Sequence, residues 1–583
     1  MDNKKKIGIL LGLVIALGFV IRIIAANNLG MAADDTITAS QAINFIDSGL
    51  IQTFNNPALW YLLTDALYKV FGVGQVTSRL VGVLFGTLLI PLLFLISGFF
   101  FSKKISLIPA FFVAISPMLI HTGSTAEMDV PMLFFVLLAQ YFFLNYLKTK
   151  KVSYFMLVPI AFGVSFLFKY LAVFFLPSIL ILFFIYSKQE NKQFRLFTVK
   201  NLKLAILFGG IFFLFIIPPL AYNYLLYSDK GYLDFQFARF TGKSKEIYQG
   251  LGGIDEKFDF RSISGLDGHH FGARDGIKFY WKDNPLLLVL GLLGLVLSFI
   301  ANKKIFHFCW PSLLFPFLFV AEASIMPKHF VFAIPYFSLL STSLLKYIDL
   351  KLNKKKIAIF LLLLLLIFAS LLSFLNLKEE RVFFKSSVGQ FMSFKTENIP
   401  VDSVFIADSR IYRGQIVWML NDMNYMEAPQ GIELLNNLDK IPGDSFIADV
   451  YFLECGSNDC GWGTIPEGSQ LDKNMESFFE GVKEQAMKVE YFVKRDGSVY
   501  ISLYKTSLQL KEGIIPIIKS SHVWFYTPVR YENMDNFIFS YGTSTLFQKL
   551  LNMLAKIILW LSFILASLSV FYLFYKLKLS FKD

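Results

Sequence analysis

Charged residues and cysteine are both scarce in this chain. Asp, Glu, Lys and Arg make up 17% of its 583 residues, and it has three cysteines. Soluble globular domains carry roughly 25% charged residues, so the composition excludes a cytosolic globular enzyme and a disordered protein. No Cys and His spacing resembles a zinc site. The net charge of +12 does not indicate nucleic-acid binding, because most of the excess Lys lies in short runs between apolar segments, where it orients a membrane protein.

Apolar stretches dominate instead. Hydrophobic residues make up 55% of the chain, which has 66 Phe, and many stretches approach the ~20 apolar residues that cross a bilayer. No small-residue cleavage site follows the first stretch, which predicts an uncleaved span. Hydropathy and Lys runs together predict an all-α polytopic membrane protein with about 12 transmembrane helices, placed in the plasma membrane with both termini cytoplasmic. The predicted spans are 7–26, 80–101, 105–120, 130–147, two short spans within 152–187 that meet at Lys169, 204–227, 285–300, 305–322, 330–347, 357–375 and 546–575.

These spans divide the chain into three parts. Residues 1–375 form the predicted transmembrane domain, with outer loops at 27–78 and 228–284. Residues 376–545 form a small extracytoplasmic α/β domain, and 546–583 form the last helix and a basic cytoplasmic tail. Within the outer domain, 401–407 and 491–504 have the alternating apolar pattern of strands, and Arg495-Asp496-Gly497 interrupts the second as a hairpin turn.

Cys455 and Cys460 lie five residues apart in the predicted outer domain. On an oxidising face of the membrane they would form a small disulfide loop. Two free thiols are the alternative. Cys309 lies in an apolar span and is expected to contribute only to packing.

Two adjacent carboxylates, Asp34 and Asp35, follow the first span. One could accept a proton from an attacking hydroxyl or amide, and the other could bind a cation or orient an acceptor. The alternative is a solvated helix cap, because Asp and the following Thr36 favour helix N-termini.

A second acidic cluster lies in the predicted outer turn before the fourth span. It contains Glu127 and Asp129, and His121 begins the same turn. Both acidic clusters are predicted on one face, so they could converge on a single pocket. Capping is again the alternative, since Asp129 followed by Pro131 is an ordinary helix start.

Cationic residues complete this predicted outer pocket. Lys169 lies among Leu and Phe and needs a partner, which a phosphate at the membrane surface would supply; a Lys that snorkels to the interface is the alternative. Arg79 opens the second span, and Lys328 and His329 lie between the ninth and tenth. Carboxylates together with several cations suit a substrate that carries a lipid-linked phosphate. The pair at 269–270, His-His, could bind a metal, but no third ligand is visible.

Several motifs in residues 1–350 have the order found in the GT-C class of membrane glycosyltransferases. They are Asp34-Asp35, Asn56-Pro57-Ala58-Leu59-Trp60-Tyr61, Phe71-Gly72-Val73, Ser78-Arg79-Leu80, Phe85-Gly86, Ser116-Pro117, the Glu127–Asp129 turn, Lys169, Lys328-His329-Phe330 and Ile334-Pro335. The chain most resembles the superfamily of dolichyl-phosphate-mannose protein mannosyltransferases and aminoarabinose transferases (family 39-like). It departs from that pattern at three places: Asn56-Pro57-Ala58 replaces His-Pro-Pro, Asp35 replaces Glu, and His329-Phe330 replaces Arg-Tyr.

The resemblance implies a GT-C fold and a glycosyltransferase of the hexosyl or pentosyl type. Such an enzyme moves one sugar from a polyprenyl-phosphate donor to a protein, lipid or glycan acceptor on the outer face, with inversion at the anomeric carbon. Asp34 would be the general base, with Asp35 beside it in the catalytic pair. Glu127, Asp129, Asn56 and His121 would shape the acceptor and donor site.

The cations Arg79, Lys169, Lys328 and His329 would bind the lipid phosphate. No cofactor is certain, and a divalent metal is possible. The missing Trp-Trp-Asp-Tyr-Gly signature argues against transfer of a whole oligosaccharide. The alternatives are a multi-pass transporter or lipid flippase and a sensory membrane protein with a ligand-binding outer domain. Transporters place ionisable groups near the bilayer midplane and often contain repeats. Here those groups lie at the predicted outer ends of spans.

Overall fold

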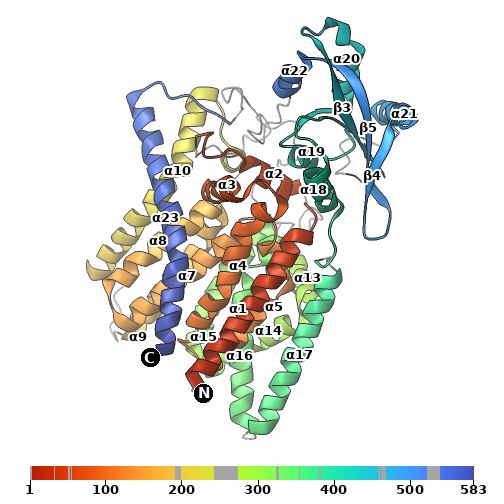
Figure 1. Ribbon diagram of the computed structural model, residues 1–583. Coiled ribbons are helices and arrows are strands. Elements are labelled where there is room, and N and C mark those ends of the chain that lie inside the picture. Colours follow the sequence, from red (N-terminus) through yellow and green to blue (C-terminus); the bar gives the residue numbers. More distant parts are fainter. Residues whose placement is uncertain are drawn as a thin grey trace.

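The computed structural model describes residues 3–582 except for a set of short gaps and two longer ones. The gaps are 32, 50, 52, 54–55, 191–198, 242–272, 324–326, 353–354, 380–381, 457–459, 461–467 and 522–538. Residues 269–270, the predicted His pair, therefore lie outside the described residues. Helices form one part of the molecule, and a sheet with its own helices lies at the end of that part away from both termini (Figure 1).

The helical part consists mainly of long apolar helices. Its elements are α1 (Asn3–Asn28), α2 (Ala33–Gln41), α3 (Leu59–Phe71), α4 (Gln75–Ser97), α5 (Leu107–Ile115), α6 (Pro117–Gly123), α7 (Asp129–Thr149), α8 (Val152–Phe168), η1 (Tyr170–Phe175), α9 (Leu176–Glu190), α10 (Val199–Lys230), α11 (Phe235–Phe240), α13 (Ala273–Asp283), α14 (Pro285–Ala301), α15 (Lys303–Ala323), η3 (Pro327–Phe330), α16 (Ala333–Leu352), α17 (Lys355–Glu379) and α23 (Leu546–Lys582). Five of the described helices are long and apolar enough to cross a membrane, or six if the bent pair α13–α14 is one span. The total of twelve spans stays a prediction.

Two helix breaks shape the functional end of this part. The predicted span 105–120 is wrong as one helix: Ser116 is extended between α5 and α6, and Pro117 begins α6, where its missing N–H costs no hydrogen bond. The break predicted at Lys169 is confirmed, because α8 ends at Phe168 and Lys169 has the extended angles φ −156° and ψ 134°. The break at Lys169 places that lysine beside Asp129, whereas the break at Ser116 lies beside Asp283.

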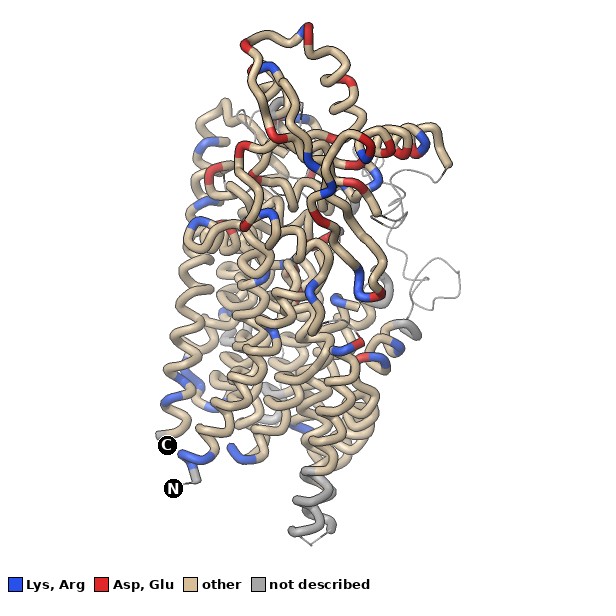
Figure 2. Tube along the Cα trace, turned by 45° about the vertical axis from the view of Figure 1, so that its right-hand side comes forward, with Lys and Arg blue, Asp and Glu red and all other residues tan. Residues whose placement is uncertain are grey.

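The two ends of the molecule differ in charge (Figure 2). Lys and Arg alone gather near the two termini, whereas the opposite end, around the sheet and the nearby helix ends, carries most of the Asp and Glu together with further Lys and Arg (Figure 2). The long helices between them are almost uncharged. This distribution matches the Lys runs seen in the sequence.

A five-stranded mixed sheet occupies part of the predicted outer segment. Its strands are β1 (Val404–Ala407), β2 (Asn424–Glu427), β3 (Ser445–Cys455), β4 (Met487–Val493) and β5 (Val499–Lys511), in the order β2-β1-β3-β5-β4. β1 pairs in parallel with β2 and β3, while β5 is antiparallel to β3 and β4. The hairpin between β4 and β5 turns at Gly497, whose φ of +84° favours glycine.

Helices and a disulfide complete the sheet-containing part. The helices are α18 (Ser387–Asn398), α19 (Arg413–Met419), α20 (Ala428–Asn436), η4 (Leu438–Lys440), α21 (Gln470–Gln485) and α22 (Ile514–Ser521). Cys455 at the end of β3 is bonded to Cys460, with their Cα atoms 5.7 Å apart. Ile406 and Phe452 lie in an apolar core between the sheet and α21, where Met475 and Phe479 are buried.

Candidate functional site

Two carboxylates from different segments meet at one lysine. Lys328 Nζ in η3 lies 2.7 Å from Asp34 Oδ2 in α2 and 2.5 Å from Glu127 Oε1, just before α7. The three residues are far apart in sequence, so only the fold brings them together. The Asp34 side chain is 39% exposed, against 12% for Glu127. Asp34 is therefore the carboxylate that a substrate can reach.

A second ion pair lies close enough for its lysine to act on Asp34. Lys169 Nζ, at the break after α8, lies 2.7 Å from Asp129 Oδ2, the first residue of α7. Asp129 is fully buried and Lys169 is 15% exposed. Glu127, just before α7, and Asp129, its first residue, are two residues apart, and each pairs with one lysine. The structure thus brings the two predicted acidic clusters together with Lys169 and Lys328.

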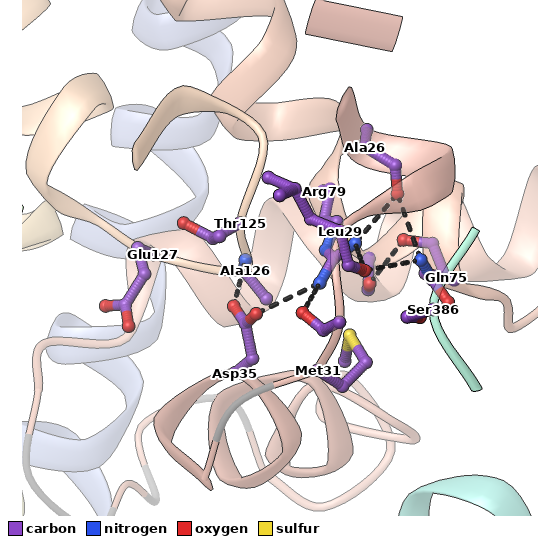
Figure 3. A network of polar contacts seen from close by, with 12 residues as sticks. Ala26, Leu29, Met31, Asp35, Gln75, Arg79, Thr125, Ala126, Glu127 and Ser386 are labelled. Atoms are coloured by element: carbon purple, nitrogen blue, oxygen red, sulfur yellow. Dashed lines mark hydrogen bonds and ion pairs between the residues drawn. The ribbon is translucent and has the colours of Figure 1, made fainter. Parts of the chain in front are cut away.

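Asp35 has a different environment from Asp34. Its Oδ2 atom lies 3.0 Å from Arg79 NH2 in α4, and its Oδ1 atom accepts the Ala126 N–H at 2.6 Å (Figure 3). Arg79 also donates to the carbonyl oxygens of Ala26, in the last turn of α1, and of Leu29 and Gly30, which follow it. Both side chains are buried, Asp35 at 2% and Arg79 at 0% exposed.

These contacts overturn two predicted roles. Asp35 is not open to an acceptor in this structure, because its side chain is 2% exposed and each of its oxygens already accepts a hydrogen bond. Arg79 cannot bind a lipid phosphate, because its guanidinium is buried and holds backbone carbonyls and Asp35. Instead, the pair ties α2 to α4, to the chain after α1 and to the turn before α7.

Opposite charges set the protonation of Asp34. Burial alone would raise its pKa, but the adjacent Lys328 outweighs this, so the pKa of Asp34 falls below its usual value. Burial likewise favours neutral Lys328, yet Glu127, Asp34 and Asp129 together raise the pKa of Lys328. At neutral pH the site therefore holds an ionised Asp34 beside a protonated lysine, and an ionised carboxylate is the form that can accept a proton.

Two neighbouring groups titrate differently. Burial raises the pKa of Glu127 to about 7, with Lys328 opposing the shift and Asp34 adding to it. Burial lowers the pKa of His329 to about 3, and the positive charge of Lys169 adds to that effect. His329 is consequently neutral at physiological pH. It can donate a hydrogen bond, but it is not the cation that the sequence suggested.

The raised pKa of Glu127 predicts a pH-dependent stability. Between the ordinary carboxyl pKa of about 4.3 and its folded value near 7, the folded state binds the proton more tightly than the unfolded state. The stabilisation of the folded state by Glu127 is therefore fully present below the unfolded pKa and is lost as pH rises through about 7. Glu127→Gln, which stays neutral, should flatten the fall in Tm between pH 5 and 8 measured in detergent. A Glu433→Gln variant, altered on α20, should keep the wild-type slope, and an unchanged slope in Glu127→Gln would contradict the assignment.

The structure gives positions for Asn56 and His121 but does not test their predicted roles. Asn56 lies beside the hydroxyl of Tyr61, a buried residue of α3 whose pKa is raised by burial and, more weakly, by Glu127 and Asp34. His121 lies in α6. Among the described residues it forms no hydrogen bond or ion pair with the acidic groups, so its place in the site stays a prediction.

Sequence reasoning missed the aromatic and amide groups near Asp34. Tyr61 was noted only as part of a motif. Tyr412 and Gln415 belong to the sheet-containing part, far along the chain, yet Gln415 Nε2 donates to the carbonyl of Met31 at 3.1 Å. No local signal in the sequence could have linked them to Asp34.

Metal binding receives no support from side-chain clustering in the part of the chain that the structure describes. No group of three or more His, Cys, Asp or Glu residues there is placed to hold a metal ion. The acids at this site are instead paired with lysines. The possible divalent metal stays an untested expectation from the sequence.

Known proteins share both sequence and fold with this chain. Residues 55–222 match the family described as Dolichyl-phosphate-mannose-protein mannosyltransferase. An uncharacterized protein of Aquifex aeolicus (strain VF5) is 27% identical over 219 residues, which are 35% of this chain and 42% of that protein. The match thus spans less than half the length of that curated relative.

Comparison with solved structures finds a similar fold in ArnT and a weaker likeness to AglB. ArnT from Cupriavidus metallidurans, bound to undecaprenyl phosphate, has a TM-score of 0.51 at 12% identity, with 86% of this chain and 98% of ArnT covered. The archaeal oligosaccharyltransferase AglB from Archaeoglobus fulgidus, in complex with an inhibitory peptide and a dolichol-phosphate, has a TM-score of 0.48 at 13% identity, with 72% and 64% covered. The family match and the fold shared with ArnT confirm the resemblance to the GT-C class.

Proposed function

We propose that this protein is a glycosyltransferase that moves a single sugar from a polyprenyl-phosphate donor to an acceptor on the outer face of the membrane. The observation that carries the proposal is the accessible carboxylate of Asp34, held ionised 2.7 Å from Lys328. It lies on a fold shared with ArnT, whose structure holds undecaprenyl phosphate. The Lys runs at the opposite end of the helices support an outward-facing site.

The reaction is an inverting displacement. Asp34 takes the proton from an acceptor hydroxyl while the acceptor oxygen bonds to the anomeric carbon. The bond from that carbon to the phosphate oxygen breaks, and the lipid phosphate leaves with the electron pair. Positive groups that face the leaving oxygen stabilise the charge that develops there.

Lys169 and Lys328 supply that positive charge. An ammonium group has three hydrogens to donate. Asp129 takes one from Lys169, while Asp34 and Glu127 take two from Lys328. Both lysines can therefore keep their carboxylate partners and still donate to a phosphate. The carboxylates also prevent either lysine from being an isolated charge at the end of an apolar helix.

A donor-lipid assay tests the proposal. Purified protein is incubated with a panel of undecaprenyl-phosphate-linked hexoses and pentoses and with membranes from a strain that lacks the gene, which hold unmodified acceptor. We expect release of undecaprenyl phosphate coupled to sugar transfer for at least one donor. If undecaprenyl phosphate is neither bound nor released with any donor of the panel, the proposal is wrong and the transporter alternative is favoured.

Lys169→Ala should weaken use of the donor. A hydrogen bond to a charged group contributes about 1.5–3 kcal/mol, so the KM for the donor lipid should rise about tenfold or more. Removing Lys169 alone also strands the buried charge of Asp129, so Asp129→Asn/Lys169→Ala provides the comparison. Both variants should lose donor affinity, whereas Asp129→Asn alone and the exposed Lys104→Ala should lose little. An unchanged donor KM in the double variant would make Lys169 a structural partner of Asp129 only.

A further inference from the structure

The sheet-containing part reaches the helix that carries Asp34. Helix α19 packs against α2, and the two lie next to each other at the end of the helical part away from the termini (Figure 1). Gln415 Nε2 donates to the Met31 carbonyl at 3.1 Å, three residues before Asp34. Tyr412 immediately precedes α19 and lies three residues, nearly one helical turn, from Gln415. Burial and then the negative charge of Asp34 raise the pKa of Tyr412 to about 12, in agreement with this placement.

Several contacts hold the backbone of Tyr412 and the side chain of Gln415 in place. The Tyr500 hydroxyl on β5 lies 2.7 Å from Gln415 Oε1 and 3.0 Å from the Cys460 carbonyl. That same carbonyl accepts the Tyr412 N–H at 3.4 Å, and the disulfide ties Cys460 to the end of β3. The start of α19 is therefore fixed by a strand and a covalent loop, which is how a rigid wall is built beside a reacting centre.

The position of this wall indicates which substrate meets it. A polyprenyl chain stays in the bilayer, so the donor phosphate approaches Asp34 from the apolar helices, where Lys169 and Lys328 lie. The acceptor must reach the anomeric carbon from the face opposite the leaving phosphate. Tyr412 comes from the sheet-containing part, beyond the ends of those helices, and so it lies on the acceptor's route.

We propose that Tyr412, at the start of the helix that Gln415 ties to Met31, forms the acceptor-side wall of the Asp34 site and determines which hydroxyl-bearing acceptors are used. This inference rests on the proposed function and adds a specificity residue to it. A tyrosine suits the role because its ring offers an apolar face and its hydroxyl offers a hydrogen-bonding group. A polyhydroxylated or hydroxyl-bearing acceptor can pack its C–H groups on the ring and hydrogen-bond to the hydroxyl.

Steady-state kinetics separate the two substrates. With the donor lipid that the wild-type protein uses and membranes of the gene-deletion strain as acceptor source, Tyr412→Ala should raise the apparent acceptor KM at least tenfold. The donor KM should stay within twofold, and Tyr412→Phe should be intermediate. Tyr491→Ala is the matched control, because Tyr491 is half-exposed on β4. Equal loss for donor and acceptor, or wild-type acceptor KM in Tyr412→Ala, would overturn the inference.

A measurement independent of activity tests the placement itself. In a Met31→Cys/Gln415→Cys variant, a short bis-maleimide should cross-link the two positions in native membranes, while Met31→Cys/Tyr491→Cys should not. Absence of the first cross-link would overturn the inference even if the protein transfers sugar. Failure of undecaprenyl phosphate to bind the wild-type protein would instead count against the proposed function, so the two failures are distinguishable.

Discussion

Asp34→Asn should reduce sugar transfer by about 10²–10⁴-fold, the usual contribution of a general base, while undecaprenyl phosphate still binds. The substitution keeps the size of the side chain and removes only its basicity. Asp34 is suited to the role because Lys328 lowers its pKa, so it is ionised at neutral pH, and because its side chain is accessible. Turnover and lipid binding measured on the same detergent-purified sample would separate chemistry from affinity.

Two comparisons make this test specific. Asp47→Asn removes a carboxylate from the same segment, where Asp47 forms an exposed pair with Lys69 at 3.0 Å, and it should leave turnover unchanged. A pH–rate profile should accompany each variant, because neighbouring acids that share a site can shift one another's titration. Near-wild-type turnover in Asp34→Asn together with an inactive Asp129→Asn would place the base in the turn before α7.

Arg79→Met should destabilise the folded protein severely. It leaves Asp35 as a buried charge without its counter-ion and strands three carbonyl oxygens that Arg79 now holds at 2.8–2.9 Å. Removing one partner of a buried ion pair costs about 3–5 kcal/mol. A large fall in Tm in detergent, with loss of the monodisperse peak in gel filtration, is the expected result.

A double-mutant cycle shows whether this cost comes from the pair. Asp35→Asn/Arg79→Met removes both charges and should be less unstable than the sum of its single variants, because neighbours in one network are not additive. Lys69→Met, which breaks the exposed Lys69–Asp47 pair, should change stability by about 0–1 kcal/mol. If Arg79→Met and Lys69→Met change stability by equally small amounts, the buried network does not stabilise the fold.

Local patterns carried much of the fold prediction. Long apolar runs and Lys clusters indicated a polytopic helical protein, since the cost of burying polar groups in lipid acts on every residue of a span. Lys169 indicated a break between two short spans, because a single charge among Leu and Phe must reach the membrane interface or a partner. The hairpin around Gly497 was likewise readable, because positive φ favours glycine wherever the turn occurs. β2 and β3 were not predicted, since their pairing with β1 depends on residues distant in sequence.

The order of residues along the chain could not by itself show which of Asp34 and Asp35 is accessible. Asp34 and Asp35 are adjacent and chemically identical, so only the family resemblance assigned the base to Asp34. In α2 successive side chains point about 100° apart, as 3.6 residues per turn requires, so one faces Lys328 and the other faces Arg79. Only the packing of α2 between η3, α4 and the turn before α7 decides which acid is accessible and which is buried.

The sequence by itself therefore determined the kind of molecule, its apolar helices and the set of ionisable residues at one end of them. Tertiary structure alone decided their roles. Lys328 and Asp34 are 294 residues apart, and Gln415 and Met31 are 384 apart. Contacts over such separations depend on how helices and sheet pack as whole elements, while composition and periodicity report only on neighbours within a few turns of chain.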